Sequence, residues 1–144
     1  MTAPSTGRKK MADKSFVLDT SALMAFIEQE EGAERVRDIL RGESIIIPWL
    51  SILEIVYISQ RELGEEEALT RYALLKKLDA EIIWEADEAL LLNAARIKST
   101  HSLSLADSVI AAIATQHNAI LIHKDPEYEQ LQNVVEMEKL PYKK

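Results

Sequence analysis

The segment Ser15-Phe16-Val17-Leu18-Asp19 contains the clearest structural signal in this sequence. Three apolar side chains stand between a serine and an aspartate, and a short apolar run with polar ends is typical of a buried strand. The next segment, 20–28, is longer and mostly apolar, which favours a helix. The sequence therefore predicts a buried strand that ends at Asp19 and passes directly into a helix.

Short apolar runs alternate with longer segments of helical period along the remaining chain. We predict strands at 15–18, 44–48, 81–84, 119–122 and 133–137, and helices at 20–28, 32–40, 51–58, 64–78, 87–99 and 104–117. Alternation of this kind implies parallel strands joined by right-handed helical crossovers. We therefore expect an α/β fold with three layers, helix, sheet and helix, and a parallel sheet of about five strands.

The chain has 144 residues, 47% of them hydrophobic, which is the size of one domain with its own core. We expect this domain to span 15–137, after a disordered N-terminal lead at 1–14 and before a C-terminal tail at 138–144. No apolar run approaches the roughly 18–20 residues that cross a bilayer, and the first ten residues lack the apolar core of a signal peptide. A cytoplasmic protein without membrane contact is therefore expected.

The composition excludes several kinds of site. The chain has no cysteine, so disulfides, thiolate metal sites and cysteine nucleophiles are ruled out. Its three histidines, His101, His117 and His123, are scattered, which argues against an all-histidine zinc site. The net charge of −7 argues against avid, non-specific nucleic-acid binding, which usually needs a basic surplus. It does not exclude an enzyme that handles nucleic acid through a metal ion.

Four acids stand where an acid is unexpected. Asp19 and Asp125 follow predicted strands, and in an open α/β sheet ligands bind beyond the carboxyl ends of the strands. Glu54 and Asp107 lie inside apolar helical segments, where an unpaired carboxylate is costly to bury. Along the chain the four acids follow the order strand end, helix, helix, strand end.

Each acid also has a purely structural explanation. Asp19 fits the N-cap of the helix that follows it, and Asp125 fits an N-cap with Pro126 at the first helical position. Glu54 fits a solvent-facing position, and Asp107 fits a cap or a bond to Ser104. These explanations account for the acids one at a time and leave their common order unexplained.

A single pocket of carboxylates explains that order. Crowded like charges raise one another's pKa and need compensation, which a hard divalent cation supplies. Mg²⁺ and Mn²⁺ prefer oxygen ligands, can activate water and can stabilise charge on a phosphodiester. The metal also lets an acidic protein hold a polyanion.

Four segments contain these acids: FVLDTSAL at 16–23, LSILEI at 50–55, LSLADSVIAA at 103–112 and LIHKDPEY at 121–128. Together they resemble the PIN-domain ribonucleases and, within them, the VapC-like toxins of toxin–antitoxin pairs. The resemblance covers about 15–136. It implies a three-layer PIN-like fold and a Mg²⁺-dependent, or Mn²⁺-dependent, endoribonuclease that cuts single-stranded RNA, with tRNA among the candidate substrates. It also implies a homodimer and a cognate antitoxin that plugs the site with a basic side chain.

By the same resemblance, the family's acidic quartet falls on Asp19, Glu54, Asp107 and Asp125, which would be both the catalytic residues and the metal ligands. We expect Asp19 and Asp107 to anchor the metal most directly. Glu54 and Asp125 would complete the shell, position the attacking water or hold a second ion. Ser21 matches a small hydroxyl residue often found beside the metal.

The sequence departs from the family at His123, where many members have a threonine or serine. A histidine there can orient a ligand or bind phosphate when it is protonated, and a surface histidine without a role is the alternative. Lys124 is the best candidate for contact with RNA. Sequence-specific RNA recognition usually needs stacking aromatic residues. We assign the four larger aromatic residues in mid-chain to the core or to a dimer interface, namely Trp49, Tyr57, Tyr72 and Trp84.

Other readings lack their defining residues. A receiver domain needs an aspartate after a middle strand, where this chain has Glu85. A haloacid-dehalogenase phosphatase needs Asp-x-Asp, where this chain has Asp19-Thr20-Ser21, and four glycines leave little room for a nucleotide-binding loop. Two alternatives stay open. One is a catalytically silent PIN domain that acts as a binding or regulatory module. The other is a metal-dependent nuclease for DNA or structured RNA, although its larger relatives have added elements for which this chain has no room.

Overall fold

The computed structural model describes residues 14–144, so the predicted disordered lead at 1–14 lies outside the described residues, apart from Lys14. Five strands form one sheet with the order β3-β2-β1-β4-β5. They are β1 (Ser15–Leu18), β2 (Ser44–Pro48), β3 (Glu81–Ile83), β4 (Ile120–His123) and β5 (Met137–Lys139). All four strand pairs are parallel, which confirms the predicted parallel sheet.

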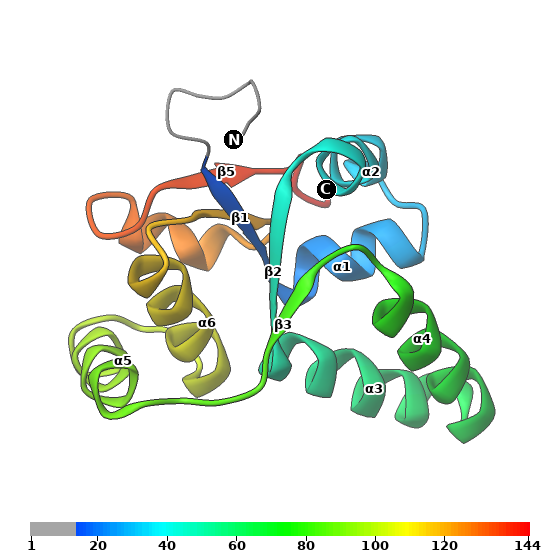
Figure 1. The fold of residues 1–144 in the computed structure, drawn as a ribbon, viewed down its shortest axis with the longest axis horizontal. Coiled ribbons are helices and arrows are strands. Elements are labelled where there is room, and N and C mark those ends of the chain that lie inside the picture. Colours follow the sequence, from blue (N-terminus) through cyan, green and yellow to red (C-terminus); the bar gives the residue numbers. More distant parts are fainter. Residues whose placement is uncertain (1–13) are drawn as a thin grey trace, which may run out of the picture.

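Helices cover both faces of this sheet (Figure 1). The α-helices are α1 (Thr20–Ile27), α2 (Ala33–Gly42), α3 (Trp49–Leu63), α4 (Glu65–Lys77), α5 (Glu88–Thr100) and α6 (Leu105–Gln116), and a 3₁₀ helix, η1, spans Pro126–Leu131. The first four helices lie on one side of the sheet, and α5, α6 and η1 lie on the other. The predicted three-layer α/β/α architecture is therefore confirmed.

The central strand β1 divides the core into two halves. Val17 packs with α5 and α6, whereas Phe16 and Leu18 pack with α1, α2 and α3. Successive side chains of a strand point to opposite faces, so a strand covered on both sides must be apolar throughout. This requirement is the physical reason why residues 16–18 form an unbroken apolar run.

The last strand begins four residues later than predicted. We expected it at 133–137, but β5 spans Met137–Lys139. The amides of Val134 and Val135 both bond to the carbonyl oxygen of Leu131, which makes a turn after η1, and the side chain of Val135 enters the core from that turn. The apolar signal at 134–135 therefore comes from a core contact of a turn.

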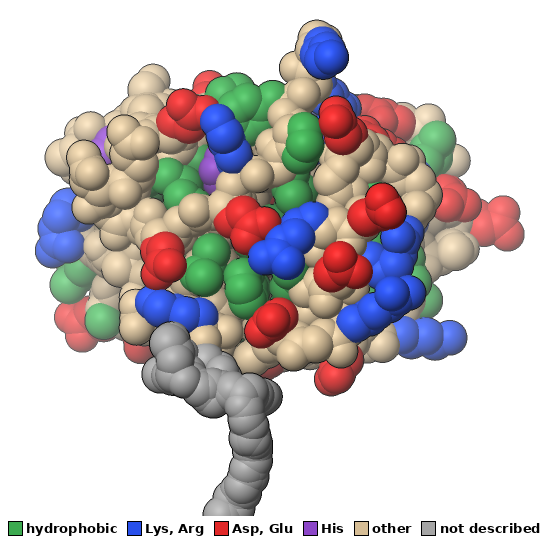
Figure 2. Space-filling view, turned by 90° about the horizontal axis from the view of Figure 1, so that it is seen from above, with side chains coloured by type: hydrophobic (Ala, Val, Ile, Leu, Met, Phe, Trp, Pro, Cys, Tyr) green, Lys and Arg blue, Asp and Glu red, His purple; other side chains and the backbone are tan. Residues whose placement is uncertain are grey.

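Two of the four aromatic residues lie on the surface. Trp84 is 53% exposed and Tyr57 is 42% exposed, so neither belongs to the core, and a dimer interface stays a prediction for both. On the face of the molecule shown in Figure 2, acidic and basic side chains are intermixed, with apolar side chains between them. The acidic surplus of the chain is therefore not gathered on that face. Within residues 14–144, no helix combines the length and the apolar character that a membrane crossing requires.

Candidate metal centre

The sheet brings the ends of β1 and β4 together. Leu18 pairs with Ile122 in the parallel register, and the amide of Asp19 donates a hydrogen bond of 3.2 Å to the carbonyl oxygen of Ile122. Asp19 and Asp125 each follow one of these strands, so both acids reach the same edge of the sheet. Parallel α/β sheets place their ligand sites at this edge.

One pocket at this edge contains all four acids singled out from the sequence. It has a volume of about 460 Å³, and the residues that line it include Asp19, Glu54, Asp107 and Asp125. Ser21 and Lys124 line the same pocket. Glu54 comes from α3 and Asp107 from the first turn of α6, so four separate elements contribute one acid each.

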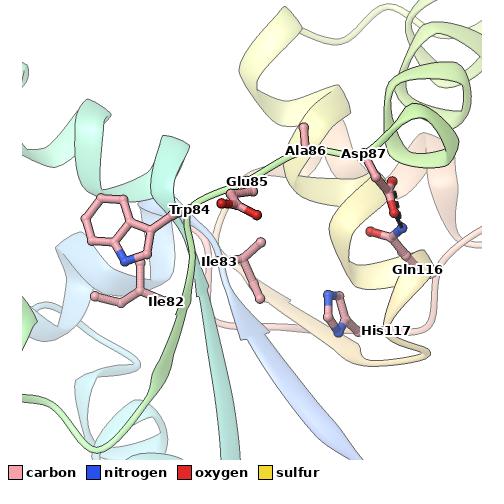
Figure 3. A pocket seen from close by; sticks show the side chains of 8 residues that line it. All are labelled: Ile82, Ile83, Trp84, Glu85, Ala86, Asp87, Gln116 and His117. Carbon is pink, nitrogen blue, oxygen red and sulfur yellow. Dashed lines mark hydrogen bonds between the residues drawn. The ribbon is translucent and has the colours of Figure 1, made fainter.

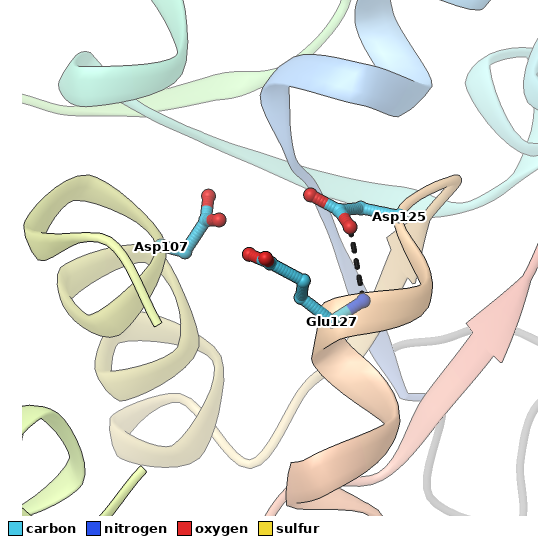
Figure 4. A group of neighbouring side chains, drawn as sticks. All are labelled: Asp107, Asp125 and Glu127. Atoms are coloured by element: carbon cyan, nitrogen blue, oxygen red, sulfur yellow. Dashed lines mark hydrogen bonds between the residues drawn. The ribbon is translucent and has the colours of Figure 1, made fainter. Parts of the chain in front are cut away.

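A fifth acid, Glu127, joins this group and was missed in the sequence analysis. One carboxylate oxygen from each of Asp107, Asp125 and Glu127 lies within 4.8 Å of the others. Figure 4 shows the three side chains pointing toward one another from α6 and the start of η1. The tight turn of η1 makes this possible, because the amide of Glu127 donates to Asp125 Oδ1 at 2.9 Å. The Asp125-Pro126-Glu127 sequence, an N-cap followed by proline, is the one local signal that Glu127 lies in the first turn of a helix beside Asp125.

Asp19 is the most constrained of the acids. Its carboxylate is only 2% exposed, it accepts the amide hydrogen of Ala22 at 2.8 Å, and Ser21 Oγ lies 2.8 Å from each of its oxygens. Ser21 Oγ also accepts the amide hydrogen of Lys124 at 2.8 Å, which ties the ends of β1 and β4 together. Burial raises the pKa of Asp19 to about 7, and the charge of Asp107 adds to the increase.

A second capping aspartate shows what this burial changes. Asp87 caps α5 by accepting the amide hydrogen of Leu90 at 2.8 Å, the same arrangement as at Asp19. Asp87 is exposed, however, and its bonds to Leu90 and Gln116 lower its pKa. Both residues are therefore helix caps. They differ in that burial raises the pKa of Asp19, whereas the pKa of Asp87 is lowered.

Asp87 belongs to another, larger hollow, of about 630 Å³, between β3, α5 and the end of α6 (Figure 3). Its carboxylate is engaged by Gln116, whose Nε2 lies 3.1 Å from both Asp87 oxygens. The only other acid in the lining is Glu85, and no group of converging acids occurs there among the described residues. The candidate site is therefore chosen by the chemistry of its lining and not by its volume.

Asp107 is held by a buried tyrosine. Tyr128 has no exposed surface, and its hydroxyl donates to Asp107 Oδ1 at 3.0 Å. Burial raises the pKa of Asp107, the Tyr128 bond opposes the increase, and the charges of Asp125 and Glu54 add to it. The Ser104 hydroxyl caps α6 at the amide of Asp107, so the backbone of this residue is fixed as well. The segment 121–128 does not by itself indicate this role of Tyr128, because the contact with α6 depends on tertiary packing.

Glu54 is partly buried and bonds to α1 across the pocket. The Thr20 hydroxyl donates to Glu54 Oε1, which links the first turn of α1 to α3. Glu54 therefore faces the pocket and not open solvent, contrary to its structural explanation in the sequence analysis.

His123 has a structural role that the sequence did not indicate. It is only 2% exposed, so the interpretation as a surface histidine is wrong. Its Nδ1 accepts the amide hydrogen of Asp125 at 3.2 Å, and its ring lies 5.0 Å from the ring of Tyr128. Burial lowers the pKa of His123, which disfavours the protonated form that phosphate binding requires.

The donor set fits a hard divalent cation. Its acids and hydroxyl residues offer carboxylate and hydroxyl oxygens, the type of ligand that Mg²⁺ and Mn²⁺ prefer. Burial raises the pKa of both Asp19 and Asp107, and no basic side chain among residues 14–144 forms an ion pair with either. A cation at this edge would provide compensating positive charge and favour the ionised carboxylates.

We predict that Asp19 makes the stability of the metal-free protein depend on pH. Its pKa is about 7 in the folded state and near 3.9 when unfolded, so its ionised form destabilises the fold. The free energy of unfolding should therefore fall as pH rises from about 4 to about 7. One pKa unit corresponds to about 1.4 kcal/mol, so this dependence amounts to a few kcal/mol. Urea denaturation in chelator should show Asp19→Asn gaining stability over wild type as pH rises.

Asp87→Asn is the matched control, since it changes an exposed cap of the same kind. Its stability relative to wild type should stay constant between pH 5 and pH 8, because the lowered pKa of Asp87 lies below that range. If the difference between Asp19→Asn and wild type is equally constant, the burial of an uncompensated charge at Asp19 is refuted.

Comparison with known proteins finds structures of similar fold. Among solved structures, the fold is similar to VapBC2 from Rickettsia felis bound to a DNA fragment from its promoter (TM-score 0.73, 15% identity, 88% of this chain and 99% of the other). It is also similar to DNA-bound VapBC from Salmonella typhimurium (TM-score 0.68, 17% identity, 88% and 98%). A third match is VapBC-1 from nontypeable Haemophilus influenzae (TM-score 0.67, 18% identity, 87% and 97%).

At these identities the likeness concerns the fold. Among curated protein sequences, no significant match to this chain is found. Residues 16–134, however, match the PIN domain family, and this range includes all the acids of the pocket. The chain therefore belongs to the PIN domain family.

Proposed function

We propose that this protein is a metal-dependent endoribonuclease that cleaves phosphodiester bonds of single-stranded RNA in the cytoplasm, as the toxin of a toxin–antitoxin pair. The observation that supports this most is the pocket itself, where Asp19 is buried beside other acids and pairs with no basic side chain of residues 14–144. Membership in the PIN domain family and the likeness of the fold to VapBC structures agree with it.

The residues of the chain have distinct tasks in this proposal. Asp19 and Asp107 bind Mg²⁺ or Mn²⁺, and both are positioned in advance, Asp19 by Ser21 and Asp107 by Tyr128. The bound cation lowers the pKa of water and stabilises charge on the phosphate. Glu54 and Asp125 complete the shell, position water or hold a second ion. We add Glu127 to this group because of its closeness to Asp107 and Asp125.

The proposed protein partner is a cognate antitoxin. The pocket is lined by seven acidic residues, Asp19, Glu28, Glu30, Glu54, Glu62, Asp107 and Asp125. A basic side chain from another protein would find electrostatic compensation there and would compete with the cation. Relatives of this fold occur in VapBC complexes, which agrees with such a partner.

The proposed homodimer uses a different surface, which we call the apolar groove. It has a volume of about 860 Å³ and lies between α3, α5 and α6. Leu53, Tyr57, Leu91 and Leu105 line it, and each is at least 42% exposed. Homodimer interfaces are more apolar than the rest of a protein surface. Because an antitoxin with a basic side chain suits the acidic pocket, we assign the apolar groove to a second copy of this chain.

We predict metal-dependent RNA cleavage that requires Asp107. Wild type should cleave members of a panel of single-stranded RNAs, tRNA included, with Mg²⁺ or Mn²⁺ and not with chelator. Asp107→Asn should lower kcat/KM at least ~100-fold, because loss of a direct ligand exceeds the effect of losing its supporting bonds. Asp79→Asn, which removes an exposed acid outside the pocket, should cleave like wild type.

The outcomes separate the alternatives. If no RNA is cleaved and added metal does not shift the thermal midpoint, the silent binding module is favoured over the nuclease. Cleavage of duplex DNA or structured RNA in preference to single strands would contradict the proposed substrate class. Cleavage that persists in chelator would contradict the role of the metal.

We predict that Leu91→Glu dissociates the homodimer. A charge in the apolar groove is costly to bury, whereas Leu92 is 55% exposed on the same helix and does not line the groove. Light scattering after size-exclusion chromatography should show a dimer for wild type and for Leu92→Glu, and a monomer for Leu91→Glu. A wild-type monomer at about 100 μM, or equal effects of the two variants, would contradict the assignment.

A further inference from the structure

The acidic pocket needs positive charge if it is to hold RNA. Among residues 14–144, two basic residues line it, Lys124 and Lys143. A metal ion compensates the phosphate at the reacting bond, but neighbouring phosphates need cations from the protein. Lys124 was the candidate from the sequence. Lys143 belongs to the C-terminal segment that the sequence analysis treated as a tail.

Lys124 is already engaged by the protein. Its side chain is only 5% exposed, and its Nζ donates to the carbonyl oxygen of Glu31 at 2.7 Å. It also lies 3.5 Å from a carboxylate oxygen of Glu30. Lys124 therefore connects the end of β4 to the loop between α1 and α2. Contact with RNA would require Lys124 to give up both of these partners.

The C-terminal segment is anchored beside the pocket. The Leu140 amide donates to the carbonyl oxygen of His123 at 2.8 Å, and the Leu140 side chain is 2% exposed. Leu140 packs directly over Gly32, where an added Cβ would lie 3.0 Å from the Leu140 Cβ. The Tyr142 hydroxyl then donates to a carboxylate oxygen of Glu129 at 2.7 Å. These contacts fix the direction of the chain just before Lys143.

Lys143 is the more exposed of the two cations that line this pocket. Its side chain is 74% exposed, and its Nζ lies 3.2 Å from Glu30 Oε2. An ion pair this exposed contributes little to stability, so the ammonium group can exchange Glu30 for a phosphate at small cost. Glu30 would keep Lys124 as its second partner.

We propose that Lys143 binds an RNA phosphate next to the scissile bond and positions the substrate over the acidic pocket. This inference rests on the proposed function, since it names the group that holds the substrate of the same site. The class of ligand is the phosphate backbone, so Lys143 contributes to affinity and not to base recognition.

The test compares Lys143→Gln with wild type on a labelled single-stranded RNA that wild type cleaves. We expect KM to rise about tenfold, which corresponds to one charge-assisted contact, with kcat within about twofold. The slope of log kcat/KM against log salt concentration should fall by about 0.7, the value for one phosphate contact on a single strand. Lys143→Arg should behave like wild type, and all variants should keep the wild-type thermal midpoint.

Lys144→Gln is the matched control, because it removes the neighbouring charge, which does not line the pocket. Equal effects of Lys143→Gln and Lys144→Gln, or an unchanged salt slope, would overturn the proposal. A higher kcat/KM in Lys143→Gln would also overturn it, since Lys143 would then obstruct the site.

Failure of the nuclease itself has a separate signature, namely no cleavage by wild type. In that case the same variants are compared for binding of the labelled RNA with Ca²⁺ present. Weaker binding and a smaller salt slope for Lys143→Gln alone would support the phosphate contact without the reaction. Equal binding by wild type and the variant would overturn it.

Discussion

The burial of one carboxylate, that of Asp19, organises the functional edge of this molecule. Asp19 is 2% exposed, and burial raises its pKa to about 7, so the ionised carboxylate is disfavoured at neutral pH. Its position is nevertheless fixed by hydrogen bonds from Ala22 and Ser21, and Ser21 also holds the end of β4. The fold thus buries an acid that has no basic partner among the described residues, and a bound cation would give a physical reason for it.

The remaining site residues are arranged around this position by supporting groups. Tyr128 and Ser104 fix Asp107, His123 holds the turn that carries Asp125, and Thr20 connects to Glu54. Each acid therefore has a second residue that sets its direction, which is the arrangement expected of a pre-formed metal site. Most of these supporting residues lie within four positions of an acid in the sequence, although the bonds that they make often cross to another element.

The sequence predicts those features that depend on local pattern. The unbroken apolar runs at 16–18 and 45–47 indicate strands covered on both faces, and the order of the acids indicates which strand ends meet. Strand β5 is different, because Met137, Glu138 and Lys139 form a strand at the sheet edge through pairing with β4 and not through hydrophobicity. Its position could not be predicted from apolar content.

The contributions of Glu127, His123 and the C-terminal segment depend on tertiary packing. Glu127 joins the acids only because η1 is tightly wound, and His123 is buried because Tyr128 and Tyr142 lie against its ring. Likewise, Lys124 resembles a free cation in the sequence but is enclosed by the loop between α1 and α2. The sequence shows which residues carry charge, whereas tertiary packing determines which charged side chains are exposed and can contact a ligand.

The central claim is that the acidic pocket binds a divalent cation through carboxylates that hold protons in its absence. Calorimetric titration of wild type with Mn²⁺ at pH 6, in two buffers of different ionisation enthalpy, tests it most directly. The account predicts binding with release of protons, and fewer released protons in Asp19→Asn, because Asp19 is mostly protonated at that pH. The absence of Mn²⁺ binding at millimolar concentration, or binding without proton release, would contradict it.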